Sequence, residues 1–530
     1  MKKKTEKASL LDRWKNRANK ESTSLQITKA PISSRYALSN TQQRLWFLQE
    51  LYPDNTFYNL SEYYLFKGEL NIDFLKESLN IIFEKHQILK SFYPTENDKA
   101  VLKIDDSKKL SINEIDFSDY DENEAESRVK AFINEQAHFN FNLSSGPLIK
   151  ASILKVSKSK HVLFLTLHHI ITDQWSMGIL KEELAYNYTK LSNNSLPEIT
   201  KNAIDFIDYA YWQSHKQNYD NQKSYWKNKL AGDIPFLNLP TDFNRPNSPS
   251  YKGRHHIFNF SKTNSSKILD LAKRLEITPF TLFLVAYYIL LQKFSKQEDI
   301  LIGSPVSNRN KKGLESAFGL FIDTVVFRTS VKKSHTISQF IKEVSSMSME
   351  ALSNKDIPFD ALVKELSIER SLAINPLFQV MFVYASKPEF PSFGNDLKLI
   401  DTYEYSPNVS KFDLTLLITE NKGELSSTFE YATDLFEEET INRFQHHLKH
   451  TLEYIVEHTD KTLANIPALI ETDKKLLITN NRQHKNDFEG FKNIHSIIEN
   501  ISITDPNNIA LTFGENSISY KTLNEKANQV

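Results

Sequence analysis

The chain has no cysteine and only 12 glycines among its 530 residues, well below the usual glycine share of about 7%. The absence of cysteine excludes disulfides, thiolate nucleophiles and cysteine-bound zinc, so acid–base or covalent chemistry has to use oxygen or imidazole groups. The glycines nowhere form the G-x-G-x-x-G or G-x-x-x-x-G-K patterns whose backbone amides bind phosphate. The sequence therefore encodes no complete nucleotide-phosphate loop.

An excess of charge of one sign is also missing, since 65 Lys and Arg residues are balanced by 66 Asp and Glu residues. This balance gives no field that attracts nucleic acid or anionic lipid, so neither is expected as a partner. The most apolar helical stretch, 280–291, is about half as long as a membrane span. The basic start, 1–20, lacks the apolar h-region of a signal peptide. We therefore expect a cytoplasmic protein without membrane contact.

Hydrophobic periodicity predicts a mixed α/β fold. Helical spacing of apolar residues in 72–89 alternates with near-continuous apolar strands such as 162–167. A second αβ stretch contains an expected buried helix at 279–294 and strands near 300–302 and 324–328. The length of the chain favours two to four domains.

The two ends of the chain differ in composition from its centre. Residues 1–35 are polar and basic, which predicts a solvated leader or, alternatively, a docking helix. The charged, asparagine-rich stretch 466–493 is typical of a linker, and a fresh pattern begins at residue 494.

The strand 162–167 runs directly into His168, which begins the segment HHIITDQWS. Polar groups at the end of a buried strand commonly form sites in α/β proteins. Adjacent histidines in an extended segment point in opposite directions, so one of His168 and His169 can face a cavity while the other packs inward. Asp173 suits a helix cap or a partner for a buried arginine, which is a structural role.

Other interpretations of this segment compete. A buried histidine is more often a satisfied core residue than a catalyst, and His-His-x-x-x-Asp arises by chance in roughly a few chains per hundred. No metal is expected, because the two imidazoles diverge and no third ligand adjoins them in sequence. A serine hydrolase would need a Gly-x-Ser-x-Gly elbow, which the pair Gly303 and Ser304 does not complete.

The segment from His168 to Ser176 matches, except for one glycine, the His-His-x-x-x-Asp-Gly-x-Ser signature of the condensation domains of nonribosomal peptide synthetases. Further blocks resemble this family and follow in its order. They lie at 39–48 (SNTQQRLWFL), 85–92 (KHQILKSF), 208–213, 225–232, 239–242, 302–309, 318–324, 356–359, 375–380, 411–414 (KFDL) and 433–436. The resemblance covers about residues 36–465, and the stretches 494–499 and 520–528 resemble the opening of an adenylation domain.

The resemblance implies an α/β fold of two chloramphenicol-acetyltransferase-like lobes, which form a V-shaped pseudodimer with a central tunnel. We expect the N-lobe at 36–215 and the C-lobe at 216–465. Residues 466–493 are then the linker, and 494–530 are the truncated start of an adenylation domain. The leader, 1–35, would dock an upstream synthetase; alternatively, the chain starts synthesis with a free-standing acyl donor.

The implied reaction is formation of an amide between a carrier-bound donor acyl or peptidyl thioester and the α-amine of a carrier-bound acceptor aminoacyl thioester. Both substrates arrive on the phosphopantetheine of separate donor and acceptor carrier domains, so this chain is expected to bind no cofactor itself. Retention of both histidines favours an active domain, and Trp175 to Gly178 resembles the subtype that takes an L-configured donor. A noncatalytic docking or recruitment module of the same fold and a coenzyme-A-dependent acyltransferase remain alternatives.

The resemblance assigns catalysis to His169, with His168 supporting the loop and Asp173 pairing with an arginine, for which we nominate Arg309. An α-amine titrates near pH 8, so part of it is already nucleophilic at cellular pH. An imidazole can orient that amine and remove its proton as the amide forms. We therefore expect His169 to act mainly by orientation and hydrogen bonding.

Gln174, Trp175 and Ser176 are expected as neighbours of the acceptor. Gln174 stands where the family has glycine, and its side chain would narrow the acceptor entrance or, if the backbone needs a positive φ, add strain. Asp323, in place of an asparagine, and Asn354, where histidine often stands, are further departures from the family pattern.

Overall fold

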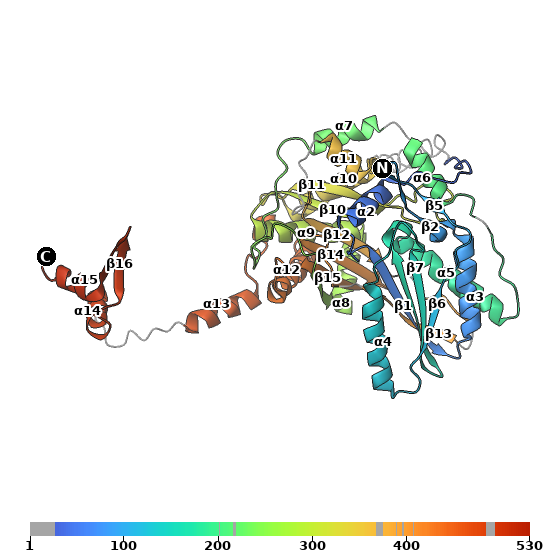
Figure 1. Ribbon diagram of the computed structural model, residues 1–530. Helices are drawn as coiled ribbons and strands as arrows, with labels where there is room; N and C mark the ends of the chain where they lie inside the picture. The colour runs from blue at the N-terminus through green and yellow to red at the C-terminus, as the bar shows by residue number, and fades with distance from the viewer. Residues whose placement is uncertain are drawn as a thin grey trace. The chain divides into compact units, whose positions relative to one another are not determined.

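The computed structural model divides into two units. The described residues are 27–200, 202–215, 219–366, 375–387, 389–394, 397–405, 408–483 and 493–530. The large unit ends at Ile466, and the small unit runs from Pro467 to Val530. The large unit holds both of the main sheets (Figure 1).

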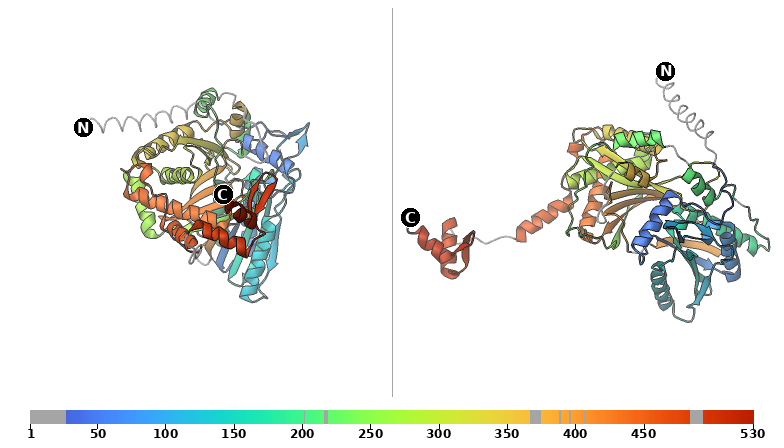
Figure 2. Two further views of the ribbon diagram at one scale, coloured as in Figure 1. Left: turned by 90° about the vertical axis from the view of Figure 1, so that its left-hand side faces the viewer. Right: turned by 45° about the horizontal axis from the view of Figure 1, so that its top comes forward.

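The first half of the large unit is built on a sheet of five strands. Across the sheet run β13 (Leu397–Tyr405), β1 (Asn59–Gly68), β8 (Lys160–His168), β7 (Ile149–Ser157) and β6 (Ile112–Asp116), with only β6 and β7 parallel. Helices α3 (Ile72–Lys85) and α5 (Gln174–Ser192) cover one face, and α4 (Glu122–Ala137) covers the other (Figures 1 and 2). Because both faces are covered, β8 is a continuous apolar run, which confirms the strand predicted at 162–167.

The second half is built on a sheet of six strands. Across it run β11 (Ile322–Ser330), β10 (Asp299–Ser307), β12 (Val380–Ser386), β14 (Leu414–Asn421), β15 (Glu424–Ala432) and β9 (Gly253–Asn259). The helices α8 (Lys262–Arg274), α9 (Pro279–Ser295), α10 (Ile337–Ser353) and α12 (Glu438–Glu457) share its core. Helix α9 starts with a Thr278 cap and Pro279 and is buried from Thr281 to Gln292, as predicted.

Several short elements complete the large unit. They are α2 (Asn40–Leu51), α6 (Phe206–His215), α7 (Asp220–Lys229), α11 (Phe359–Glu365), the 3-10 turns η1 (Gln87–Lys90), η2 (His169–Ile171) and η3 (Leu463–Asn465), and the strand pairs β2 (Ser91–Phe92) with β5 (Lys103–Ile104) and β3 (Thr95–Glu96) with β4 (Lys99–Ala100). Within the described part of the chain no single helix is long and apolar enough to span a membrane. Only α8 and α9 meet that test jointly, and they are bent by 107°.

Two segments from the second half of the sequence complete the core of the first half. Strand β13 pairs with β1 along the edge of the five-stranded sheet. The connection 308–321 between β10 and β11 contributes Leu314, Phe318 and Phe321 to the same core. The expected lobe boundary at residue 215 therefore divides the sequence but not the packing. The connection 308–321 also carries Arg309 into the first half.

The described start of the chain is packed against the large unit. Ile27 is 7% exposed, the backbone N–H of Ala30 donates to Asp208 Oδ1 at 2.8 Å, and Lys29 Nζ lies 3.1 Å from Asp208 Oδ2. Packing thus begins inside the expected leader, 1–35, because Asp208 on α6 provides an acceptor for it. The residues before Ile27, and with them the alternative docking helix, lie outside the described residues.

The small unit contains α13 (Glu471–Gln483), α14 (Ile494–Thr504), β16 (Ile509–Phe513), β17 (Asn516–Ser519) and α15 (Tyr520–Ala527). Helix α13 occupies part of the expected linker, 466–493, because Glu471 and Asp473 suit the first turn of a helix. No residue of α14 or α15 is buried, and Phe513 is 90% exposed. The described part of this unit therefore has apolar side chains without a core of its own.

We predict that replacing Gly303 by alanine destabilises the large unit. Gly303 lies in β10, where an added Cβ would overlap the ring of Phe378, a buried side chain that is 1% exposed. Overpacking of this kind costs about 1–3 kcal/mol, so the urea unfolding midpoint should fall. Gly178→Ala in α5 is the control, because its Cβ would meet nothing within 4 Å and should leave stability unchanged or raised by up to about 1 kcal/mol. Equal midpoints for the two variants would contradict the prediction.

Candidate active site

The segment that follows β8 makes a tight turn into α5. The strand ends at His168, the turn η2 follows, and α5 begins at Gln174. The carboxylate of Asp173 caps the helix by accepting the backbone N–H of Ser176 at 2.8 Å. His168 Nδ1 accepts the backbone N–H of Ile170 at 3.2 Å. The second of these hydrogen bonds sets the direction of the His168 imidazole.

His169 presents a neutral imidazole with one defined acceptor nitrogen. Its Nδ1–H donates to the carbonyl oxygen of Thr172 at 2.7 Å, and since a carbonyl only accepts, Nε2 is left as the acceptor. Its backbone N–H donates to the carbonyl oxygen of Tyr58 at 2.7 Å. Burial lowers the pKa of His169 to about 4, helped by the charge of Lys411 and opposed by the carboxylate of Asp173. The ring is therefore uncharged at neutral pH.

His168 is 2% exposed and packs inside the first half. Its ring lies 6.4 Å from that of Phe141 and 6.5 Å from that of Tyr58, measured between centroids. Burial lowers the pKa of His168 to about 3, and the neighbouring His169 and Lys411 act in the same direction. His168 therefore supports the turn as a neutral core residue.

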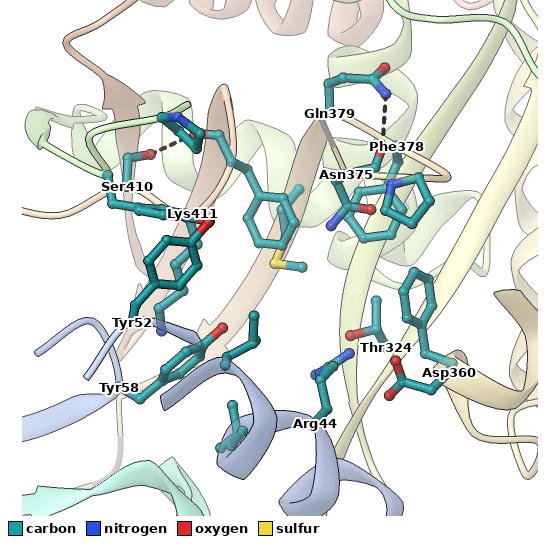
Figure 3. Close-up of a pocket in the computed structure, with 18 of the residues that line it drawn as sticks. Arg44, Tyr52, Tyr58, Thr324, Asp360, Asn375, Phe378, Gln379, Ser410 and Lys411 are labelled. Atoms are coloured by element: carbon teal, nitrogen blue, oxygen red, sulfur yellow. Dashed lines mark hydrogen bonds between the residues drawn. The ribbon is translucent and has the colours of Figure 1, made fainter. Parts of the chain in front are cut away.

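His169 lines a cavity of about 630 Å³ that takes its walls from both halves of the large unit. Arg44 of α2 and Asp360 of α11 face this space, as Figure 3 shows. Further wall residues include Tyr52, Tyr58, Tyr251, Pro305, Thr324, Asn375, Phe378, Gln379, Met381, Ser410, Lys411 and Phe412. This volume is in the range of small-molecule sites, and the few polar groups stand among apolar and aromatic ones.

Lys411 and Tyr58 form one part of the cavity wall (Figure 3). Lys411 Nζ lies 4.6 Å from the centroid of the Tyr58 ring, a cation–π contact. The backbone of the same tyrosine accepts the N–H of His169. The lysine charge is thus held close to the imidazole that lines the cavity.

Asp173 and Arg309 form a buried ion pair, with 0% and 4% of their side chains exposed. Arg309 Nη2 lies 3.1 Å from Oδ1 and 3.4 Å from Oδ2 of Asp173, and the N–H of Phe321 donates to Oδ2 at 2.9 Å. Arg309 also donates to the carbonyl oxygen of Leu314 at 2.8 Å and to Ser176 Oγ at 2.7 Å. The structure therefore brings together the two residues that sequence reasoning nominated as a pair.

Gln174, Trp175 and Ser176, expected beside the acceptor, do not line the cavity that His169 lines. Trp175 is 55% exposed and donates through Nε1 to the carbonyl oxygen of Glu315 at 3.0 Å. Ser176 is buried and hydrogen-bonded to Gly319. These residues point elsewhere because the capped first turn of α5 directs them away from the cavity.

The alternative that Gln174 strains the backbone is wrong. Gln174 is the first residue of α5 and is not among the described residues with a positive φ, so glycine offers no conformational advantage there. Its side-chain Nε2 donates to Glu62 Oε1 at 2.9 Å.

The other two departures sit in structural positions. Asp323 Oδ1 accepts the backbone N–H groups of Thr324 at 2.7 Å and Phe359 at 3.4 Å, and burial raises the pKa of this carboxyl to about 6. Asn354 follows α10 and donates through its side chain to the carbonyl oxygen of Glu350 at 2.9 Å. Neither residue lines the cavity.

Sequence reasoning missed Tyr58, Lys411, Arg44 and Asp360 as site residues. Arg44 and Lys411 lie inside blocks recognised only as family motifs, and a charged residue in such a block is the signal that could have found them. Among the described residues no group of three or more histidine or carboxylate side chains is arranged to hold a metal ion.

The comparisons with known proteins agree with one another. The family model for the condensation domain matches residues 32–478. A linear gramicidin synthase protein of Brevibacillus parabrevis is 33% identical over 517 residues, which are 96% of this chain and 7% of that protein. Bacitracin synthase 3 of Bacillus licheniformis is 32% identical over 519 residues, 96% of this chain and 8% of that protein. The chain spans less than a tenth of the length of these two relatives.

Solved structures of the same fold include the X-domain from teicoplanin biosynthesis, with 21% identity and a TM-score of 0.74, covering 84% of this chain and 100% of that one. The four-domain nonribosomal peptide synthetase holo-AB3403 has 23% identity and a TM-score of 0.74, covering 94% of this chain and 38% of that one. They confirm the predicted α/β fold of two chloramphenicol-acetyltransferase-like lobes.

We predict that Arg309→Met strongly destabilises the large unit. The variant leaves Asp173 buried without its cation, and removal of one partner of a buried pair costs about 3–5 kcal/mol. Arg254→Met is the control, since Arg254 and Glu438 lie 3.9 Å apart with 64% and 67% of their side chains exposed, and an exposed pair contributes under about 1 kcal/mol. Denaturant unfolding measures both, and similar losses would refute a special role for the buried pair.

We also predict that stability falls as pH decreases from about 6.5 towards 4. The folded chain holds the pKa of His168 at about 3 and of His169 at about 4, whereas the unfolded chain binds these protons near pH 6.5. Between these pH values the unfolded state binds more protons than the folded state. The stability contributed by the neutral histidines is therefore complete above about pH 6.5 and is lost as the pH falls. In His168→Gln the loss in urea midpoint between pH 7 and pH 5 should be smaller than in the native chain. Parallel curves would argue against a buried neutral histidine here.

Proposed function

Because the chain belongs to the condensation-domain family, we propose that it joins a donor acyl or peptidyl thioester to the α-amine of an acceptor aminoacyl thioester in nonribosomal peptide synthesis. Both substrates are carried on the phosphopantetheine of separate carrier domains. The observation that carries the proposal is the neutral imidazole of His169, which keeps Nε2 as its acceptor nitrogen and belongs to a residue that lines a cavity of about 630 Å³.

The properties of His169 favour orientation over strong base catalysis. An α-amine titrates near pH 8, so a useful fraction of it is uncharged at neutral pH. Nε2 of His169 accepts an N–H of that amine and aims its lone pair at the thioester carbonyl carbon. The N–C bond forms, the C–S bond breaks, and the proton of the amine passes through the imidazole to the departing thiolate. With a pKa of about 4, His169 holds that proton only briefly.

The surrounding charges suit this chemistry. Attack on the carbonyl places negative charge on its oxygen, and a cation in a partly desolvated cavity stabilises such a charge more than it would in water. Lys411, held against the ring of Tyr58, is a cation of the cavity wall whose charge also lowers the pKa of the His169 imidazole. The same positive charge therefore adds to burial in keeping His169 neutral and favours the tetrahedral intermediate.

Residues 494–530 are, on the same premise, the opening of an adenylation domain. The apolar side chains of the small unit support this, since Ile494 is 79% exposed, Ile503 is 78% exposed and neither α14 nor α15 buries any residue. A larger domain would bury such a surface. The L-configured donor, the docking of an upstream synthetase through residues 1–35 and the cytoplasmic location stay predictions.

We predict that His169→Ala lowers amide formation at least about a hundredfold, the effect typical of a lost proton-transfer and orienting group. The measurement mixes aminoacyl-loaded donor and acceptor carriers with the chain and follows the mass of the acceptor. His138→Ala is the matched control, because His138 is exposed at the end of α4, where its ring contacts the carbonyl oxygen of Asn134. Equal product from native chain and His169→Ala would refute catalysis by His169. No product from the native chain across a panel of donors would identify a noncatalytic module.

A further inference from the structure

Gln174, which stands where the family signature has glycine, is hydrogen-bonded to a buried carboxylate. Its Nε2 donates to Oε1 of Glu62 at 2.9 Å. Glu62 lies in β1 and is 2% exposed. Its other oxygen, Oε2, accepts the hydroxyl of Tyr64 at 2.7 Å and lies 3.9 Å from Lys181 Nζ. The carboxylate therefore has a partner on each oxygen and a cation close by.

Two residues on one face of α5 supply this environment. Gln174 and Lys181 are seven positions apart, so both turn towards the sheet, where β1 places Glu62. Lys181 is itself buried, at 7% exposed, and its Nζ lies 5.5 Å from the centroid of the Tyr64 ring. A glycine at position 174 would leave Oε1 of Glu62 without this donor. A buried charged acceptor that loses its donor is costly.

The start of α5 is thus held from two sides by consecutive residues. Asp173 binds Arg309 and the N–H of Phe321, both on the connection 308–321. Gln174 binds Glu62 on β1 of the five-stranded sheet. The residue before them, Thr172, supplies the carbonyl oxygen that accepts Nδ1–H of His169. Only two peptide bonds separate Gln174 from the group that orients the imidazole.

We propose that Gln174 is a positioning residue for His169 and that Gln174 and Glu62 form a matched pair. The hydrogen bond to Glu62 holds the first turn of α5 against β1 and thereby fixes the carbonyl of Thr172 that orients the ring. Glycine alone does not replace Gln174 in this chain, because Oε1 of the carboxylate beneath it would lose this side-chain donor. The effect on activity rests on the function proposed above, whereas the effect on the loop does not.

The experiment removes the amide while keeping the shape of the side chain. Gln174→Met should lower the maximal rate of amide formation about tenfold, the change expected from one lost hydrogen bond to a charged group. The carrier concentration at half-maximal rate should stay unchanged, since the amide touches Glu62 and does not line the substrate cavity. Hydrogen exchange at the backbone N–H of Ser176 should accelerate. Glu182→Met, at an exposed position of the same helix, should leave the rate, the carrier concentration at half-maximal rate and the exchange at Ser176 unchanged.

A double-mutant cycle tests the pairing. In a Glu62→Gln background the further change Gln174→Met should cost less than about threefold, because a hydrogen bond to a neutral acceptor is weaker. Gln174→Glu alone places two carboxylates together and should be worse than Gln174→Met. The exchanged pair, Glu62→Gln with Gln174→Glu, restores an amide-to-carboxylate hydrogen bond and should regain most of the rate.

Each outcome of these experiments either supports or overturns the proposed role of Gln174. Equal effects of Gln174→Met in the two backgrounds would overturn the matched pair, and unchanged rate and exchange in Gln174→Met would overturn the positioning role. If the native chain forms no amide, the proposed function is wrong. Hydrogen exchange at Ser176 in Gln174→Met then still tests whether Gln174 holds the start of α5. Faster exchange at Ser176 would then support this role, and unchanged exchange would reject it.

Discussion

The buried ion pair between Asp173 and Arg309 is the interaction on which the site depends. A carboxylate with 0% exposure is tolerable only when its charge is neutralised and its oxygens accept hydrogen bonds. Arg309 supplies the charge, and the N–H groups of Ser176 and Phe321 supply the remaining donors. These partners come from α5 and from the connection between β10 and β11. The residues that follow His169 are therefore tied to a segment from the second half of the sequence.

The same desolvation determines what the histidines can do. Burial lowers the pKa of both His168 and His169, and the positive charge of Lys411 acts in the same direction on each. An imidazole held neutral in this way is a poor reservoir for a proton but a good hydrogen-bond acceptor with a fixed direction. Since an α-amine needs little help to lose its charge, direction is the property that the proposed reaction would use.

Local patterns predicted much of this fold, whereas contacts between distant segments were predicted only in part. The apolar runs at 162–167 and 279–294 became β8 and α9 because each is covered on all sides, a condition that the sequence displays directly. The entry of 308–321 into the core of the first half has no comparable signature. The sequence did not predict helix α13, because its residues are polar and weakly periodic, as in a linker.

The residues of the site show the same difference between local patterns and contacts of distant segments. His168, His169 and Asp173 stand together in sequence, so their neighbourhood was visible, whereas Arg309 was nominated only through the resemblance to the family. Lys411 and Tyr58 meet His169 only through the fold, and no spacing rule links them. The strain considered for Gln174 was wrong for a further reason. Replacement of a glycine suggests strain, but here the backbone is helical and the consequence lies in the side chain.

The contrast between glycine and glutamine at position 174 shows two ways of fixing the loop that carries His169. A glycine contributes nothing to hold the loop, so its neighbours must do so, and it leaves the strand beneath free to be apolar. Gln174 adds a hydrogen bond to β1, but that bond is stabilising only because Glu62 is there to accept it, and Glu62 is tolerable only with Tyr64 and Lys181 beside it. The complete network stabilises the fold more than its separate hydrogen bonds would alone. It follows that the departure from the family signature cannot be understood, or reversed, at one residue.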